Sequence, residues 1–65
     1  GDKNYSKNTH NGQEFDVVIE GTLEVTIDNK VLVLEKGDSI YFDGRHPHCM
    51  RALHGKPAKF LCVVI

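Results

Sequence analysis

The chain is 65 residues long, and its 8 lysine and arginine residues against 9 aspartate and glutamate residues give a formal net charge of −1. This balance, with no basic patch or basic amphipathic helix, argues against contact of this segment with nucleic acid or a membrane surface. No apolar run approaches the ~20 residues that a membrane span requires. A chain this short buries only ~60% of its unfolded surface, so we expect one small domain that is stabilised as a homodimer.

Residues 1–13 are mostly polar, and the turn dipeptide Asn11-Gly12 lies near the end of this stretch. A first strand is predicted over residues 15–20 and ends at Gly21. The next predicted strand, residues 22–27, alternates strictly between apolar and polar side chains. That alternation is typical of a strand with one buried face.

Two later stretches are apolar on both faces. Residues 31–35 follow a short hairpin connection, and we expect them to be buried on both sides, as in the wall of a barrel. Residues 60–65 follow a turn that contains Pro57. An exposed apolar edge strand invites aggregation, so this last stretch is expected to be central in a sheet or paired across a dimer.

The stretch from Gly37 to His48 combines a turn, a strand and a rigid corner. Glycine tolerates the positive φ of a turn, and residues 39–42 are a β-prone run with two aromatic side chains. Pro47 fixes its own φ and favours an extended residue before it. His48 is therefore presented at the start of a further strand, residues 48–53, where it can serve as a ligand or a base.

No stretch combines helical periodicity with helix caps, and short strands with regular glycine punctuation indicate an all-β architecture. The sequence predicts a single domain over residues 1–65, a small jelly-roll-like antiparallel β-barrel of about six short strands. We expect this domain to be excised from a longer protein, with the N-terminal part missing.

Widely separated side chains are predicted to share one site. His10 and Glu14 are four residues apart, an even spacing that puts both on one face of an extended segment. Glu14 and Asp16 share a strand face, as do His48 and Met50. If the barrel brings these faces together, His10, Glu14 and His48 form a set that suits one divalent transition metal ion, Fe, Mn, Zn or Ni. Asp16 and Met50 would then line a pocket for a small molecule.

The remaining histidines and the cysteines are given ordinary roles. His46, beside Arg45, is expected on a solvated loop or as a second pocket group, and His54 is expected on the surface. Cys49 and Cys62 form no CxxC pair. We interpret them as free thiols that fill the core in a reduced cytoplasm.

With these residues in view, the sequence resembles the cupin family. The run of a glutamate, six residues and a glycine from Glu14 to Gly21 resembles the end of the first cupin motif, and the stretch from Gly37 to His48 resembles the second. Asn8 occupies the position of a further ligand histidine. The resemblance implies three metal ligands: His10, Glu14 and His48.

A finer resemblance is to the C-terminal cupin domain of helix-turn-helix transcriptional regulators. It is carried by residues 37–43 with Pro47-His48, and by Glu14-Phe15 and Glu20-Gly21. In such proteins a DNA-binding domain precedes the cupin, which senses an effector and dimerises. The resemblance implies a bacterial, cytoplasmic regulator that binds a small-molecule effector and contacts DNA only through the missing N-terminal domain.

Three functions remain open. The first is a small-molecule or metal-sensing domain of a regulator, with no catalytic residue. The second is a structural dimerisation module, in which His10 and Glu14 only hydrogen-bond one another. The third, kept as the alternative to sensing, is a small metal-dependent enzyme of the isomerase or dioxygenase type.

Overall fold

The structure of the protein is a computed structural model, and it describes residues 8–65. The predicted all-β fold is confirmed, and each strand lies within two residues of its predicted bounds. No helix among these residues is long and apolar enough to cross a membrane. The strands are β1 (Gln13–Glu20), β2 (Leu23–Ile27), β3 (Lys30–Leu34), β4 (Ser39–Asp43), β5 (His48–Ala52) and β6 (Lys59–Val64).

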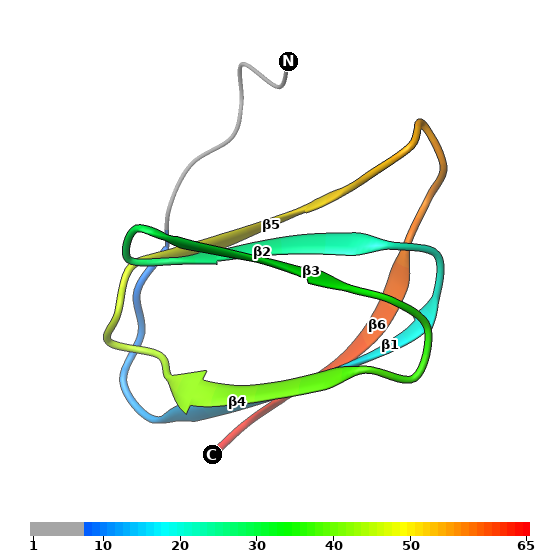
Figure 1. Ribbon diagram of the computed structural model, residues 1–65. Helices are drawn as coiled ribbons and strands as arrows, with labels where there is room; N and C mark the ends of the chain where they lie inside the picture. Colours follow the sequence, from blue (N-terminus) through cyan, green and yellow to red (C-terminus); the bar gives the residue numbers. More distant parts are fainter. Residues whose placement is uncertain (1–7) are drawn as a thin grey trace.

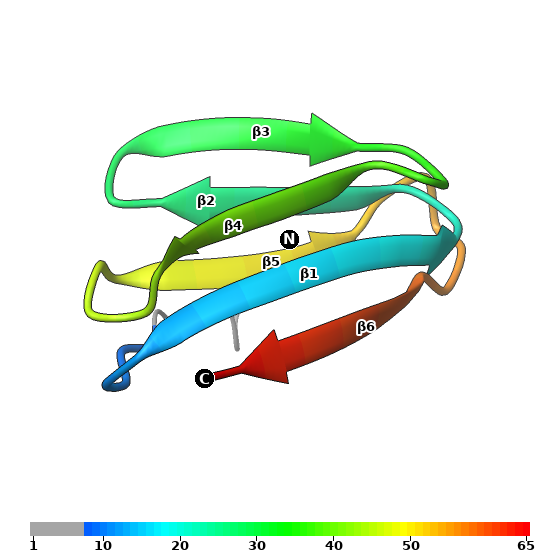
Figure 2. The same ribbon diagram turned by 90° about the horizontal axis from the view of Figure 1, so that it is seen from below.

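The six strands form two three-stranded antiparallel sheets, in the orders β4-β1-β6 and β3-β2-β5. The two sheets lie as facing layers, with β2, β3 and β5 in one and β1, β4 and β6 in the other (Figure 1). In Figure 2, the view from below, β4 crosses in front of β2 of the other layer, and β6 lies at the outer edge beside β1. The sequence alternation of β1 and β2 therefore turns one side chain in two toward the space between the layers.

The core is small and lies between the two sheets. Its buried apolar cluster consists of Val18, Leu23, Val25 and Leu34. Leu23 and Val25 are 2% and 0% exposed, which is the buried face expected from the alternation over residues 22–27.

The turn before β4 is attached to β1 by two hydrogen bonds. The Gly37 N–H donates to the Val18 carbonyl at 2.8 Å, and the Val18 N–H donates to the Asp38 carbonyl at 2.9 Å. Gly37 has a φ of +91°, the left-handed region that was expected there. These bonds fix one end of the barrel.

Both stretches that are apolar on two faces turn out to be edge strands. On β3, the side chains Val31, Leu32 and Val33 are 58%, 41% and 51% exposed. The predicted burial of this stretch on both faces is therefore wrong. Its outer edge has no strand beside it within residues 8–65, so only Leu34 reaches the core.

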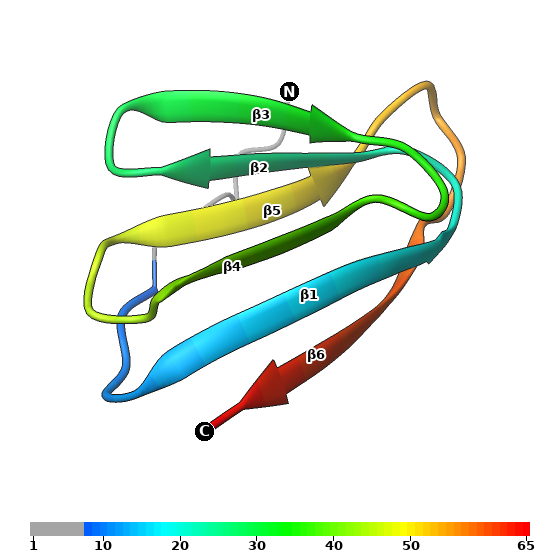
Figure 3. The same cartoon turned by 60° about the horizontal axis from the view of Figure 1, so that its bottom comes forward.

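The last strand, β6, pairs only with β1 among the described residues and lies at the outer edge of its sheet (Figure 3). The predicted central position is therefore wrong for this chain. All six residues of β6 are exposed. Pairing of this edge across a dimer stays a prediction.

Candidate metal centre

Three side chains from separate parts of the chain meet between the two sheets. His10 precedes β1, Glu14 lies on β1, and His48 begins β5. One ligand atom from each lies within 4.8 Å of the other two. The His10 Nε2 lies 2.9 Å from the Glu14 Oε1, and the His48 Nε2 lies 3.3 Å from the same oxygen. Glu14 and His48 are buried, so the cluster is accessible mainly from the His10 side.

Backbone pairing across the two sheets places His10. Asn8 and His48 exchange two backbone hydrogen bonds, of 2.8 and 3.0 Å, and the His10 N–H donates to the Gly44 carbonyl at 3.0 Å. Gly44 is buried, and a Cβ at this position would overlap the His10 ring. Asn8, the residue at the position of a further ligand histidine, therefore positions the site through its backbone.

The Nδ1 atoms of both rings are held by backbone carbonyls. The His10 Nδ1 lies 3.2 Å from the Asn11 carbonyl oxygen, and the His48 Nδ1 lies 2.7 Å from the His46 carbonyl oxygen. A carbonyl only accepts, so each Nδ1 carries the proton and a neutral ring presents a lone pair at Nε2. Both lone pairs face the same oxygen of Glu14, so three acceptors converge on one point. A proton or a metal cation would be bound favourably at such a point. Histidines that bind a metal typically donate their other ring N–H to a carbonyl or carboxylate, as both Nδ1 atoms do here.

The charges of the cluster are strongly linked. The hydrogen bond to Glu14 and the bond to the Asn11 carbonyl raise the pKa of His10 above its ordinary 6.5. Burial acts to raise the pKa of Glu14, but its hydrogen bonds, first with Asp16 and then with His10, outweigh burial and hold that pKa below 4.5. Glu14 is therefore an anion at neutral pH, and a metal ion would compete with the His10 proton.

Asp16 lies two residues further along the same face of β1. Its side chain is 0% exposed, and no nitrogen or hydroxyl donor contacts either carboxylate oxygen. Burial, followed by interaction with Glu14, raises the pKa of Asp16 from 3.8 to about 7. Two carboxyl groups can share a hydrogen bond only when one is protonated, so Asp16 carries a proton over much of the acidic range.

A pocket of about 440 Å³ opens beside the cluster. Its volume falls in the range of about 300–1,000 Å³ that is typical of small-molecule sites. Met50, predicted as a pocket residue, lies on its wall, whereas Asp16 is not among the lining residues. The lining comprises Asn8, His10, Glu14, His48, Cys49, Met50, Phe60, Cys62 and Val64.

The other two histidines lie outside this cluster. The His46 Nδ1 lies 3.0 Å from the Asp28 Oδ2, and about half of each side chain is exposed. His46 is therefore the loop residue that was expected rather than a pocket group. His54 is exposed, also as expected, and has a φ of +62° in the turn before β6.

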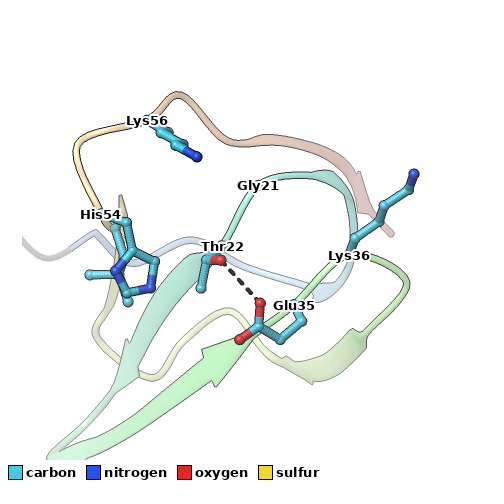
Figure 4. A pocket seen from close by; sticks show the side chains of 7 residues that line it. Gly21, Thr22, Glu35, Lys36, His54 and Lys56 are labelled. Carbon is cyan, nitrogen blue, oxygen red and sulfur yellow. Dashed lines mark hydrogen bonds between the residues drawn. The ribbon is translucent and has the colours of Figure 1, made fainter.

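A second hollow, of about 430 Å³, lies at the start of β2 and borders His54. Figure 4 shows its polar groups, with the Thr22 hydroxyl donating to the Glu35 carboxylate at 3.0 Å. The amino end of Lys36 points away from this pair in the same view. Its charged groups do not converge on one point, so the histidine cluster is the stronger candidate for a functional site.

Two residues of the site were not identified from the sequence. Cys49 is buried, as expected of core filler, but Cys62 is exposed and lines the pocket; both thiols are free. Cys62 lies opposite Asp16 in the pairing of β6 with β1. That pairing joins the first strand to the last, and no local signal reveals it. For Gly44 the signal was present, because glycine in a buried position suggests the close approach of another group.

The fold and the site together define a small β-barrel domain with two imidazoles and a carboxylate at its centre. The family described as "Cupin domain" matches residues 1–64. The chain belongs to this family, as its resemblance to the two cupin motifs implied.

Two similar proteins extend the comparison. "Uncharacterized protein MJ1618" of Methanocaldococcus jannaschii is 31% identical over 62 residues, which make up 95% of this chain and 50% of that protein. A crystal structure of Fe(II) HppE in complex with substrate superimposes with a TM-score of 0.86 at 31% identity, over 95% of this chain and 37% of that one. The chain thus spans half or less of the length of either relative.

Proposed function

We propose that this cupin domain binds one divalent transition metal ion through His10, Glu14 and His48. The observation that carries the proposal is the convergence of two imidazole Nε2 atoms on one carboxylate oxygen, at 2.9 and 3.3 Å, while both Nδ1 atoms are held by carbonyls. A structural module would need only one histidine paired with Glu14. Glu14 and His48 are buried, so the Glu14 carboxylate is shielded from water. A cation is attracted to a carboxylate more strongly in such an environment than in water.

Fe(II) is the first candidate for the ion. Two histidines and one carboxylate with open positions are typical of non-haem Fe(II) sites, and Mn, Zn and Ni accept the same donors. The likeness to a structure of Fe(II) HppE supports this order. Such an ion, when bound, supplies a Lewis acid with free positions for a small molecule.

The residues around the cluster define what the small molecule must match. Met50 and Phe60 give the pocket an apolar wall, and the ligand set lies at one side of it. A small molecule that fits this pocket would therefore have an oxygen or nitrogen donor facing the cluster and an apolar part facing β5 and β6. Edge-to-face packing of Phe42 on His48, at 4.8 Å between ring centroids, holds that imidazole in place.

In the longer protein, the proposed role of the domain is to sense this small molecule or the metal for a bacterial transcriptional regulator. The regulator-like second motif and the net charge of −1, which leaves DNA contact to another domain, support this role. The test is DNA affinity of the full-length protein with and without metal. A regulator changes its affinity on metal loading, since the ion must bind one state more tightly than the other.

A second candidate is a small metal-dependent enzyme. It is favoured by one observation, the similarity to a substrate complex of Fe(II) HppE. In that case the metal-loaded protein converts a small molecule that the metal-free protein leaves unchanged, and metal loading leaves DNA affinity unaltered.

The proposal includes a homodimer formed through β6. Within residues 8–65 this strand has one neighbour, β1, and its backbone edge is open on the other side. Leu61 and Val63 are 54% and 41% exposed on it, and Ile19 is 52% exposed on β1. A second copy that pairs with this edge would cover both the backbone groups and the apolar side chains.

The metal proposal is tested by thermal unfolding of untagged, metal-free protein after addition of Fe(II), Mn, Ni or Zn ions. Binding to the folded state raises the midpoint temperature. Fe(II), Mn or Ni added to His48→Ala protein gives no rise, because this variant lacks one of the three ligands. If no ion shifts the wild-type midpoint, or if the variant shifts equally, the proposed site is wrong.

A further inference from the structure

A second group of possible ligands lies on the other side of Glu14. It comprises Glu14, Asp16 and Cys62, whose ligand atoms all lie within 4.8 Å of one another. The sheet itself brings them together: Asp16 and Cys62 are direct partners in the pairing of β1 with β6. Glu14 lies on the same face of β1, two residues before Asp16 in the sequence. Cross-strand partners of this kind have Cβ atoms about 4.5–5.5 Å apart, so the arrangement follows from strand register and not from loop conformation.

The Asp16 carboxyl group has no basic or hydroxyl partner in this place. It is 0% exposed, and the groups that interact with its oxygens are the two other members of this cluster, the Glu14 carboxylate and the Cys62 thiol. A buried carboxylate without donors is strongly unfavourable, since its desolvation is not offset. The Asp16 carboxyl group must therefore be protonated when no metal is bound, and it can be ionised only when a cation lies beside it. Val18, the next residue on this face, is apolar and fully buried, so nothing on that side offers a donor.

We propose that Glu14, Asp16 and Cys62 form a second divalent-cation site, which adjoins the histidine site and shares the Glu14 carboxylate with it. Thiolate and carboxylate donors together suit a thiophilic ion such as Zn²⁺ or Cd²⁺, whereas Fe(II) is better served by the two imidazoles. The structure thus assigns different ions to the two sides of Glu14. The second site does not depend on occupation of the first.

Access to the second site is through the pocket. Cys62 and Glu14 both line it, whereas the fully buried Asp16 does not. An ion would therefore meet the thiol and Glu14 first and reach Asp16 last. Binding converts the Cys62 thiol to a thiolate, and its proton is released to the solvent.

The metal-free thiol is held in its protonated form. Cys62 as a whole is exposed, but partial desolvation of its thiol, followed by the hydrogen bond with Asp16, raises the pKa of Cys62 to about 12. Cys62 is therefore not a nucleophile at neutral pH. A divalent cation would reverse this influence, because it replaces the repulsion from two carboxylates with attraction.

The experiment is a titration of metal-free protein with Cd²⁺ while thiolate-to-cadmium charge-transfer absorption is recorded in the ultraviolet. Cys49 provides a matched control, since it is a free thiol on β5 and is not part of this group. We expect the wild type and Cys49→Ser to show the thiolate band, and Cys62→Ser to lose it together with one equivalent of bound Cd²⁺. Asp16→Asn should weaken the band at a given Cd²⁺ concentration.

Two further results separate this site from the histidine site. His48→Ala removes a ligand of the first site only, so it should keep the band and its equivalent. Loss of the band in His48→Ala would show a single shared site and overturn the proposal. Absence of the thiolate band in the wild type would also overturn the proposal. This result needs no variant, so the test remains decisive even if Cys62→Ser fails to fold.

Discussion

The His10 imidazole lies in the space that a side chain on Gly44 would need. His10 lies in the segment before β1 and Gly44 in the turn after β4, and the His10 N–H donates a 3.0 Å hydrogen bond to the Gly44 carbonyl. Glycine at position 44 is therefore a condition for the position of the first histidine of the site.

Gly44→Ala is expected to displace the His10 ring and to weaken metal binding by about 10–100-fold, the range found when groups that orient a ligand are changed. Metal affinity is measured by calorimetric titration. Gly55→Ala is the control: nothing lies within 4 Å of its added Cβ. Its φ of +67° predicts a loss of stability without a loss of affinity. Wild-type affinity in Gly44→Ala would show that His10 does not contribute to binding.

The histidines of the chain should separate into two classes. His48→Ala is expected to abolish binding at the first site, since it removes one of three ligands. His46→Ala should leave binding unchanged, because His46 is on the surface and pairs with Asp28. Equal effects of the two substitutions on affinity would contradict the assignment of His48.

Metal affinity should rise with pH across the range in which His10 loses its proton. The pKa of His10 is raised above 6.5 by Glu14, so a proton competes with the ion at higher pH than for a free imidazole. Titrations at about pH 6, 7 and 8 are expected to show steadily tighter binding. An affinity that does not change over this range would mean that His10 is not a ligand.

Asp16 is expected to destabilise the metal-free protein as pH rises. Its pKa is about 7 in the folded protein against an ordinary 3.8. The folded state thus holds the proton more tightly, and the stability that this proton provides is lost as pH rises from about 4 to about 7. Asp16→Asn should therefore raise the free energy of unfolding at about pH 8 and change it little at about pH 4. Urea unfolding in the presence of a chelator measures both, and a stabilisation that is equal at the two pH values would be inconsistent with a buried charge.

The dimer proposal predicts a difference between the two exposed edge strands. Leu61→Glu on β6 should convert the protein to a monomer, whereas Val31→Glu on β3, at a similarly exposed position, should leave the dimer intact. Sedimentation velocity distinguishes these outcomes. A wild-type monomer at micromolar concentration, or dissociation by Val31→Glu alone, would exclude the β6 interface.

The strands, and the faces that carry the three ligand candidates, could be predicted because they depend on local pattern, whereas the meeting of those faces was expected only on the condition that the strands close into a barrel. Alternation puts Glu14 and Asp16 on one face of β1, and Pro47 marks the start of the strand that begins with His48. Edge positions could not be predicted, because an apolar run like that of β3 is equally typical of a central strand. The neighbours of a strand depend on the whole topology.

Cys62 was missed for the same reason. Its position opposite Asp16 depends on the pairing of the first and last strands, and strand register between distant segments has no sequence signal. The lack of a nitrogen or hydroxyl donor at Asp16 depends on the same packing, because only the folded sheet removes water from that carboxyl group.

Binding of Fe(II) by His10, Glu14 and His48 can be measured by anoxic calorimetric titration of metal-free protein, with Glu14→Gln as the comparison. Gln preserves the volume of the shared ligand and removes its charge, so we predict one Fe(II) per chain for the wild type and none for the variant. A wild type that binds no Fe(II), or a Glu14→Gln protein that binds it as tightly, would contradict binding by these three residues.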